Sequence, residues 1–259
     1  MVVTTFDGWD PTQYNRFAQQ REQPFWDLAN LIHEVPGPRV VDLGCGDGRL
    51  TALLGAQLHA SSVAGIDSSL AMINAAAAHA NGSTQFELAD IGTWQEPSSY
   101  DVVFANASLQ WVPDHPSALA RWADSLRDRG QLAVQVPANA DLPSHVIAAT
   151  GAAEMLSDPP PDAVAENVLT PERYATILDG LGFVEQHVRL QVYAHRLAST
   201  SEVVEWVKGT TLTRFKQALG EAGFEQFVER YRARLLDEVG DQAPYLYPFK
   251  RILMWARRS

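Results

Sequence analysis

Short apolar runs alternate with amphipathic stretches along the first half of the chain. Apolar runs bounded by glycine or polar residues are typical of buried strands, and apolar residues three or four positions apart are typical of helices. The pattern predicts a strand at 39–44, a helix at 47–59, a strand at 62–67, a helix at 69–81, strands at 84–88 and 100–106, a helix at 116–128 and a strand at 130–137. This alternation predicts a parallel sheet covered by helices on both faces.

The second half of the chain is less regular. We expect an apolar helix near 145–156, and then the stiff connection 158-DPPPDA-163, together forming an insertion beside the sheet. Thr170 begins a predicted helix that ends near residue 181. A strand at 183–197, amphipathic helices at 200–219 and 222–239, and a final strand at 245–258 complete the prediction.

Composition and charge limit the classes of function. The chain has 259 residues, is 46% hydrophobic and carries a formal net charge of −11, which argues against a nucleic-acid partner and favours a small-molecule or protein substrate. The sequence has neither a leader-like N-terminus nor an apolar run of membrane-spanning length, so we expect a cytoplasmic protein without a membrane partner. The single cysteine, Cys45, has no Cys or His cluster around it, so neither a disulfide nor a bound metal is expected.

A glycine-rich turn follows the first predicted strand. In 40-VVDLGCGDGRL-50, three glycines at alternate positions separate a strand from a helix, where bare backbone can approach a ligand closely. The pattern differs from the G-x-G-x-x-G dinucleotide fingerprint and lacks the Lys-Ser/Thr of a P-loop. It therefore indicates a nucleotide-binding turn of another kind, with a purely structural loop as the alternative.

Two aspartates follow neighbouring strands. Asp67 ends the strand 62–67, where its carboxylate could accept hydrogen bonds from both hydroxyls of a ribose. Its alternative role is to cap the next helix, although Ser68 could do that equally well. Asp90 follows the strand 84–88 and could accept the exocyclic amine of adenine, or it could be an ordinary loop residue.

This order of features resembles the class I S-adenosylmethionine-dependent methyltransferases over roughly residues 10–137. The resemblance implies an α/β fold with a Rossmann-like, seven-stranded, mostly parallel sheet and a helical insertion or cap. It implies S-adenosyl-L-methionine as the cofactor. The cofactor contacts that it implies within the predicted sheet are Asp42, Gly44, Gly46, Asp67, Ser68, Met72, Asp90, Ile91 and Asn106.

The resemblance also assigns roles to these residues. The glycine turn would face the methionine moiety, and Asp42 would orient the amino group of that moiety through the loop. Asp67 would hold the ribose, and Met72 and Ile91 would sandwich the adenine, with Asp90 at its amine. Asn106 would lie near the methionine end.

The N-terminal segment 9-WDPTQYNRFAQQR-21 is similar to the helix that covers the cofactor in many small-molecule methyltransferases. Tyr14 and Arg21 are the candidate contacts, and the alternative is an amphipathic helix that only packs on the core. We expect one methyltransferase domain over 1–259. Its predicted parts are a helical lid at 1–35, a cofactor-binding half at 36–137, cap segments at 138–170 and 198–242, and final sheet elements at 171–197 and 243–259.

The segments 105-ANASLQWVPDHPSAL-119 and 245-YLYPFKRILMWARR-258 resemble the trans-aconitate methyltransferases and, more weakly, the malonyl-carrier-protein O-methyltransferases of biotin synthesis. Both families esterify a carboxylate. The resemblance to the first family implies that a small polycarboxylate becomes a methyl ester while the cofactor becomes S-adenosylhomocysteine. The sequence is also compatible with methylation of carbon or nitrogen in another metabolite, and with a non-catalytic S-adenosylmethionine-binding protein.

A carboxylate is already ionised at neutral pH, so we expect catalysis by positioning and no acid or base residue. A polycarboxylate requires local positive charge, and the candidate residues are Lys208, Arg214, Lys250 and Arg251. Each could equally be a solvated surface residue. Arg251 differs because it lies within an apolar strand and requires a partner, which could be the acceptor or a carboxylate of the protein. Trp111 could form a pocket wall or pack in the core. The sequence does not indicate an oligomeric state.

Overall fold

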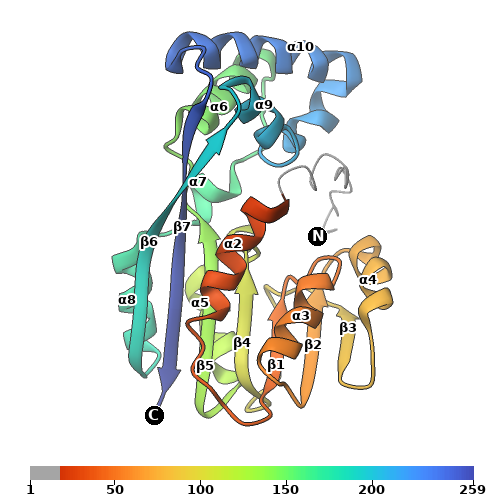
Figure 1. The fold of residues 1–259 in the computed structure, drawn as a ribbon, viewed down its shortest axis with the longest axis vertical. Helices are drawn as coiled ribbons and strands as arrows, with labels where there is room; N and C mark the ends of the chain where they lie inside the picture. The colour runs from red at the N-terminus through yellow and green to blue at the C-terminus, as the bar shows by residue number, and fades with distance from the viewer. Residues whose placement is uncertain (1–17) are drawn as a thin grey trace. The chain divides into compact units, whose positions relative to one another are not determined.

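The computed structural model describes residues 18–259, with side chains from residue 22 onward, and contains one seven-stranded sheet with helices around it (Figure 1). The strands are β1 (Arg39–Leu43), β2 (Ser62–Asp67), β3 (Thr84–Leu88), β4 (Tyr100–Asn106), β5 (Leu126–Pro137), β6 (Phe183–Leu197) and β7 (Tyr245–Arg258). The helices are α2 (Ala18–Ala29), α3 (Arg49–Gln57), α4 (Leu70–Ala76), α5 (His115–Asp124), α6 (Pro143–Met155), α7 (Ala163–Asn167), α8 (Pro171–Gly180), α9 (Ser201–Lys208) and α10 (Thr213–Val239), with 3-10 turns η1 (Ala77–His79) and η2 (Leu109–Trp111). No helix in this described part is long and apolar enough to cross a membrane.

The strand order is β3-β2-β1-β4-β5-β7-β6. The pairings from β3 to β5 are all parallel, and β7 runs antiparallel to β5. Strand order therefore reverses at β1, from which β2 lies on one side and β4 on the other. Ligands of open α/β sheets bind at the carboxyl ends of the strands beside such a reversal, so the fold places a candidate site beyond the ends of β1, β2 and β4.

The chain divides into two compact units. The sheet unit comprises Gln23–Pro137, Asn167–Gln191 and Arg251–Ser259, and the helical unit includes Ala138–Glu166 and Val192–Lys250. The sheet unit thus contains β1 to β5 with α3, α4, α5 and α8. The helical unit contains α6, α9, α10 and the neighbouring ends of β6 and β7.

One face of the sheet is covered by α2 and α3. The side chains of Phe25 and Leu28 from α2, and of Leu54 from α3, form a buried cluster with alternate residues of the strands. Those strand residues are Val40, Val63, Val102, Phe104, Ala133, Leu253 and Trp255. Residues that point to the opposite face, such as Val41 and Val103, are also fully buried. Burial on both faces explains why the parallel strands appear in the sequence as continuous apolar runs.

The helical unit has its own aromatic core. Trp206 of α9 lies with Phe227 and Tyr231 of α10, and with Tyr247 and Phe249 of β7, in one buried cluster. Large buried aromatic side chains contribute much of the packing energy of a core. This unit therefore folds around apolar contacts of its own.

Local sequence signals explain where several helices begin. The side chain of Asp114 accepts a hydrogen bond from Ser117 N at 3.2 Å, and that of Thr170 accepts one from Arg173 N at 3.3 Å. A proline lies in the first turn of both α5 and α8, where its missing N–H removes no hydrogen bond of the helix. The predicted role of Thr170 as a helix start is thus confirmed.

Several predicted helices have different bounds in the structure. The helix expected at 116–128 ends at Asp124, and β5 begins at Leu126, because Leu126 pairs with Tyr100 of β4. The helix expected at 69–81 is split into α4 and the 3-10 turn η1. Two helices were expected at 200–219 and 222–239, but α9 ends at Lys208 and α10 begins at Thr213, so the break lies at 209–212. The helix α10 has a kink at Gly220, whose φ is 67°. The short helix α7 was not predicted.

Candidate active site

The glycine turn after β1 is held against the ends of β2 and β4. Gly44 N and Cys45 N both donate to Ile66 O, at 2.7 and 3.0 Å. Gly44 has a φ of 86°, and a Cβ added there would lie 2.2 Å from the Cβ of Ser108. Only glycine permits both this left-handed backbone and this close approach, so the turn is fixed beside the end of β4.

Gly46 is different, because it faces open space. Its φ is 57°, and an added Cβ would meet no atom of the described residues within 4 Å. Here glycine is required for the backbone conformation, and no described side chain fills the space above it. The turn therefore has the geometry of a ligand cradle.

Asp67, at the end of β2, faces this turn. Its Oδ2 atom accepts from Gly46 N at 3.0 Å, and its Oδ1 atom accepts from Ser69 N at 2.9 Å. A carboxylate has about four lone-pair sites, so each oxygen can accept one more hydrogen bond from a ligand hydroxyl. The alternative of helix capping by Asp67 or Ser68 is wrong: Ser69 is the N-cap of α4 and accepts from Met72 N at 3.3 Å. Ser68 itself is exposed.

Asp42 lies in β1 beneath the turn and is buried. Thr51 of α3 donates its hydroxyl to Asp42 Oδ2 at 2.5 Å. Burial raises the pKa of Asp42 from 3.8 to about 7, with a further contribution from the charge of Asp67, although the Thr51 hydrogen bond opposes the rise. Asp42 is thus a buried carboxyl that lies beneath the turn and is hydrogen-bonded to Thr51.

The end of β4 places polar side chains next to the glycine turn. Ser108 donates its hydroxyl to Leu43 O at 2.5 Å, joining this segment to β1. Asn106 is the last residue of β4, and its Oδ1 atom is shielded from solvent without a hydrogen-bond partner in the described structure. A buried amide oxygen of this kind is costly unless a ligand donates to it. The ligand role of Asn106 stays a prediction, and this oxygen without a partner is the observation that supports it.

The predicted adenine-binding residues lie along the β2 and β3 side of the same unit. Met72 of α4 is half-buried, and Ile91 is 9% exposed. Asp90 is exposed, and its Oδ1 atom accepts from Gly92 N at 2.8 Å. Of the two N-terminal candidates, Tyr14 lies outside the described residues, and Arg21 belongs to α2 but its side chain is not described.

The candidate substrate cations fall into both units. Arg214 forms an ion pair with Asp162 at 2.7 Å, with side-chain exposures of 17% and 14%. Burial alone would raise the pKa of Asp162, but the charge of Arg214 and its hydrogen bond outweigh burial and hold that pKa below its ordinary value. Lys250 forms an ion pair with Asp141 at 2.5 Å. Lys208 is exposed at the end of α9.

Arg251 and Trp111 belong to the sheet unit. Arg251 is half-buried in β7 and pairs in register with Pro137, the last residue of β5. The side chain of Trp111 is 62% exposed, so the alternative of core packing is wrong for this residue. His115, which starts α5, is buried instead and lies 2.7 Å from the hydroxyl of Tyr174 through Nδ1.

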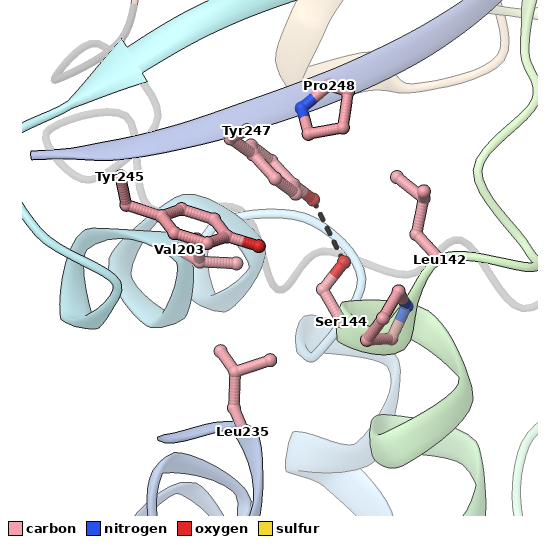
Figure 2. A pocket seen from close by; sticks show the side chains of 8 residues that line it. Leu142, Ser144, Val203, Leu235, Tyr245, Tyr247 and Pro248 are labelled. Carbon is pink, nitrogen blue, oxygen red and sulfur yellow. Dashed lines mark hydrogen bonds between the residues drawn. The ribbon is translucent and has the colours of Figure 1, made fainter. Parts of the chain in front are cut away.

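A small cavity lies inside the helical unit (Figure 2). Its volume is about 50 Å³, and the hydroxyls of Ser144 and Tyr247 are joined across it at 3.0 Å. The rest of its lining is largely apolar: Leu142, Pro143, Val203, Leu235, Tyr245 and Pro248. A water needs roughly 15 Å³ of such space, so this cavity accepts a few waters but no organic acceptor. It is a packing feature and not the candidate active site.

Sequence reasoning missed Gln135 of β5, which pairs in register with Asn106. Its side chain is 1% exposed, and neither amide atom has a hydrogen-bond partner within the described residues. The signal in the sequence was a glutamine inside the apolar run 130–137. This signal is weak, because polar residues also occur in protein cores where hydrogen bonds satisfy them.

Fold and glycine turn together are typical of nucleotide-binding α/β proteins, and the candidate site lies at the carboxyl ends of β1, β2 and β4. A profile of the methyltransferase domain family matches residues 14–227, and the chain belongs to this family.

Curated relatives extend this result over nearly the whole chain. A protein of Deinococcus radiodurans named trans-aconitate 2-methyltransferase is 41% identical, over 96% of this chain and 98% of its own length. A Streptomyces avermitilis protein with the same name is 36% identical, over 97% of each chain. A third, from Mycobacterium tuberculosis, is 33% identical over 96% of each.

Solved structures show the same fold at low sequence identity. The YcgJ protein of Bacillus subtilis is 14% identical with a TM-score of 0.62, covering 93% of this chain and 98% of its own. Phosphoethanolamine N-methyltransferase 2 of Haemonchus contortus, solved with S-adenosylhomocysteine, is 17% identical with a TM-score of 0.57, covering 99% of this chain and 60% of its own. The predicted class I methyltransferase fold is confirmed.

Proposed function

We propose that this protein transfers a methyl group from S-adenosyl-L-methionine to a carboxylate of trans-aconitate, or of a closely similar small polycarboxylate. The observation that carries the proposal is the 41% identity, over 96% of the chain, to a protein named trans-aconitate 2-methyltransferase. Two further relatives of that name, at 36% and 33% identity over nearly their full lengths, support it.

The residues around the glycine turn fit the cofactor. The open space above Gly46 accommodates a ligand against bare backbone, and the carboxylate of Asp67 has acceptor capacity left for the ribose hydroxyls. The shielded Oδ1 atom of Asn106 can accept from the ammonium group of the methionine end. Met72 and Ile91 are the candidate walls of the adenine pocket.

The cofactor supplies a methyl group that is already activated by its positively charged sulfur. A carboxylate oxygen of the acceptor forms the new C–O bond as the methyl–sulfur bond breaks, and the electron pair of that bond stays on sulfur. No proton is transferred, because a carboxylate is ionised at neutral pH. The protein must therefore hold the two reactants in line and exclude water, and such positioning lowers the barrier by several kcal/mol.

An acceptor panel tests the proposal. The purified protein is incubated with S-adenosylmethionine and, separately, trans-aconitate, cis-aconitate, citrate, isocitrate and malonyl-carrier protein, and each acceptor is analysed by mass spectrometry. We expect one added methyl on trans-aconitate. Product on the carrier protein alone would move the assignment to biotin synthesis, and binding of the cofactor without any product would favour a non-catalytic role.

A further inference from the structure

Two glutamines of β5 occupy comparable positions in very different environments. Gln131 and Gln135 are each 1% exposed and lie four residues apart on one strand. Gln131 Oε1 accepts from His33 N at 2.7 Å and from Trp255 Nε1 at 2.9 Å, and its Nε2 atom donates to His33 O at 2.8 Å. Gln135 has no such bonds from either amide atom within the described residues.

Both glutamines point to the face of the sheet that α2 covers. Side chains alternate along a strand, so Gln131, Ala133 and Gln135 share a face, and Ala133 belongs to the cluster with Phe25 and Leu28 of α2. Register pairing supports this assignment, because Gln135 lies opposite Leu253 of β7, another member of the cluster. Gln135 is therefore a buried amide on a covered face, where an unsatisfied polar group is expensive.

Two polar residues lie near Gln135 on this face, at the carboxyl end of the parallel strands. Asn106 of β4 is its register partner, so the two residues lie on adjacent strands about 4.8 Å apart. On the other side, Arg251 of β7 pairs with Pro137, two residues beyond Gln135 and on the same face. The strand order β1-β4-β5-β7 therefore places the glycine turn, Asn106, Gln135 and Arg251 on successive strands near the carboxyl end of β5, with Arg251 two residues along β7 from Leu253, the register partner of Gln135.

We propose that Gln135 binds the reacting carboxylate of the acceptor, while Arg251 supplies positive charge for a carboxylate that does not react. This inference rests on the proposed function. The amide N–H groups of Gln135 donate to a carboxylate oxygen without placing a full positive charge on it, so the oxygen keeps its nucleophilicity toward the methyl carbon. A guanidinium, by contrast, carries a full positive charge and suits a carboxylate that is bound but does not react.

The experiment compares Gln135→Met with the matched control Gln131→Met. We expect Gln135→Met to raise the KM for trans-aconitate by about ten- to a hundredfold, while the calorimetric affinity for S-adenosylhomocysteine and the Tm stay close to wild type. Gln131→Met should lower the Tm, because it leaves His33 N and Trp255 Nε1 unpaired, and should not raise the KM. Gln135→Glu keeps the shape and removes the N–H donors, so its KM should rise at least as far.

Binding of trans-aconitate to the protein saturated with S-adenosylhomocysteine gives a readout that does not need turnover. Wild type that binds trans-aconitate without esterifying it would refute the proposed function alone. Three results would overturn the role of Gln135. The first is a wild-type KM in both Gln135 variants, and the second is a loss of cofactor affinity in them as large as the loss of acceptor use. The third is that wild type does not bind the carboxylate.

Discussion

The carboxylate of Asp67 and the backbone N–H of Gly46 are joined by a hydrogen bond of 3.0 Å, which ties the end of β2 to the glycine of the turn that faces open space. The same side chain thus shapes the cradle and has acceptor capacity for a ribose within it. The hydrogen bond therefore links the two features that the sequence motif brings together.

Replacement of Asp67 by alanine should weaken cofactor binding. Asp67→Ala removes the acceptor for Gly46 N and the proposed contact to the ribose, so we expect S-adenosylhomocysteine affinity to fall roughly ten- to a hundredfold with the fold intact. Isothermal titration calorimetry measures this. Asp47→Ala is the matched control, because that exposed carboxylate of the same turn accepts from Arg49 N, at 3.2 Å, and not from Gly46 N. If Asp67→Ala and Asp47→Ala bind S-adenosylhomocysteine with equal affinity, the cofactor site lies elsewhere.

Gly46→Ala tests the open space above the turn. The left-handed φ of 57° predicts a loss of stability of about 1–2 kcal/mol. A methyl group in the ligand space should also lower cofactor affinity beyond any effect on folding. Gly82→Ala provides the comparison, since its added Cβ also meets no described atom within 4 Å but its backbone is not left-handed. Wild-type cofactor affinity in Gly46→Ala would contradict the cradle assignment.

The buried carboxyl of Asp42 predicts a particular pH dependence of stability. Burial raises its pKa to about 7 in the folded protein, against 3.8 in the unfolded chain. The folded state therefore retains this proton between about pH 4 and 7, and the stability it contributes is present below pH 4 and is lost as the pH rises toward 7. At about 1.36 kcal/mol per pH unit, the loss is at most roughly 4 kcal/mol.

Asp42→Asn isolates this contribution, because asparagine resembles the protonated carboxyl and can still accept from Thr51. Urea unfolding from pH 4 to 8 should show that the stability of Asp42→Asn relative to wild type rises between pH 4 and 7 and then stays constant. A difference independent of pH would show that Asp42 is ionised in the folded protein throughout this range.

The exposure of Trp111 predicts a small effect on stability. Trp111→Ala should change the free energy of unfolding by less than about 1 kcal/mol, since the side chain is 62% exposed. Trp122→Ala, at a position that is 0% exposed, should cost roughly 3–5 kcal/mol. If Trp111 forms a wall of the acceptor site, its variant should raise the KM for trans-aconitate. An equally large loss of stability in both variants would contradict the exposed placement.

Much of the sheet could be predicted from the sequence. Five strands have the predicted bounds, at 62–67, 84–88, 100–106, 183–197 and 245–258. These segments are recognisable because an apolar or alternating run ends in a polar, glycine or proline residue. The start of β5 was predicted too late, because the segment 126–129 has a helical pattern and becomes a strand only through the pairing of Leu126 with Tyr100.

The candidate site could be predicted where a motif carries it and not elsewhere. Gly44, Gly46 and Asp67 lie together at adjacent strand ends, as their spacing indicated. Gln135 could not be separated from Gln131 by sequence, since both are glutamines in the same strand. Only their surroundings differ: His33 and Trp255 satisfy one amide, while the other lies beside Asn106.

The chemical bond that holds the transferred methyl group in the product distinguishes methylation of a carboxylate from methylation of carbon or nitrogen. The protein is incubated with trans-aconitate and S-adenosylmethionine that carries a labelled methyl group, and the isolated product is then treated with mild alkali. We expect a product heavier by one methyl group, whose label is released as methanol because the methyl group is held in an ester. Label that resists alkali would show methylation of carbon or nitrogen, and an absence of labelled trans-aconitate would contradict the proposed acceptor.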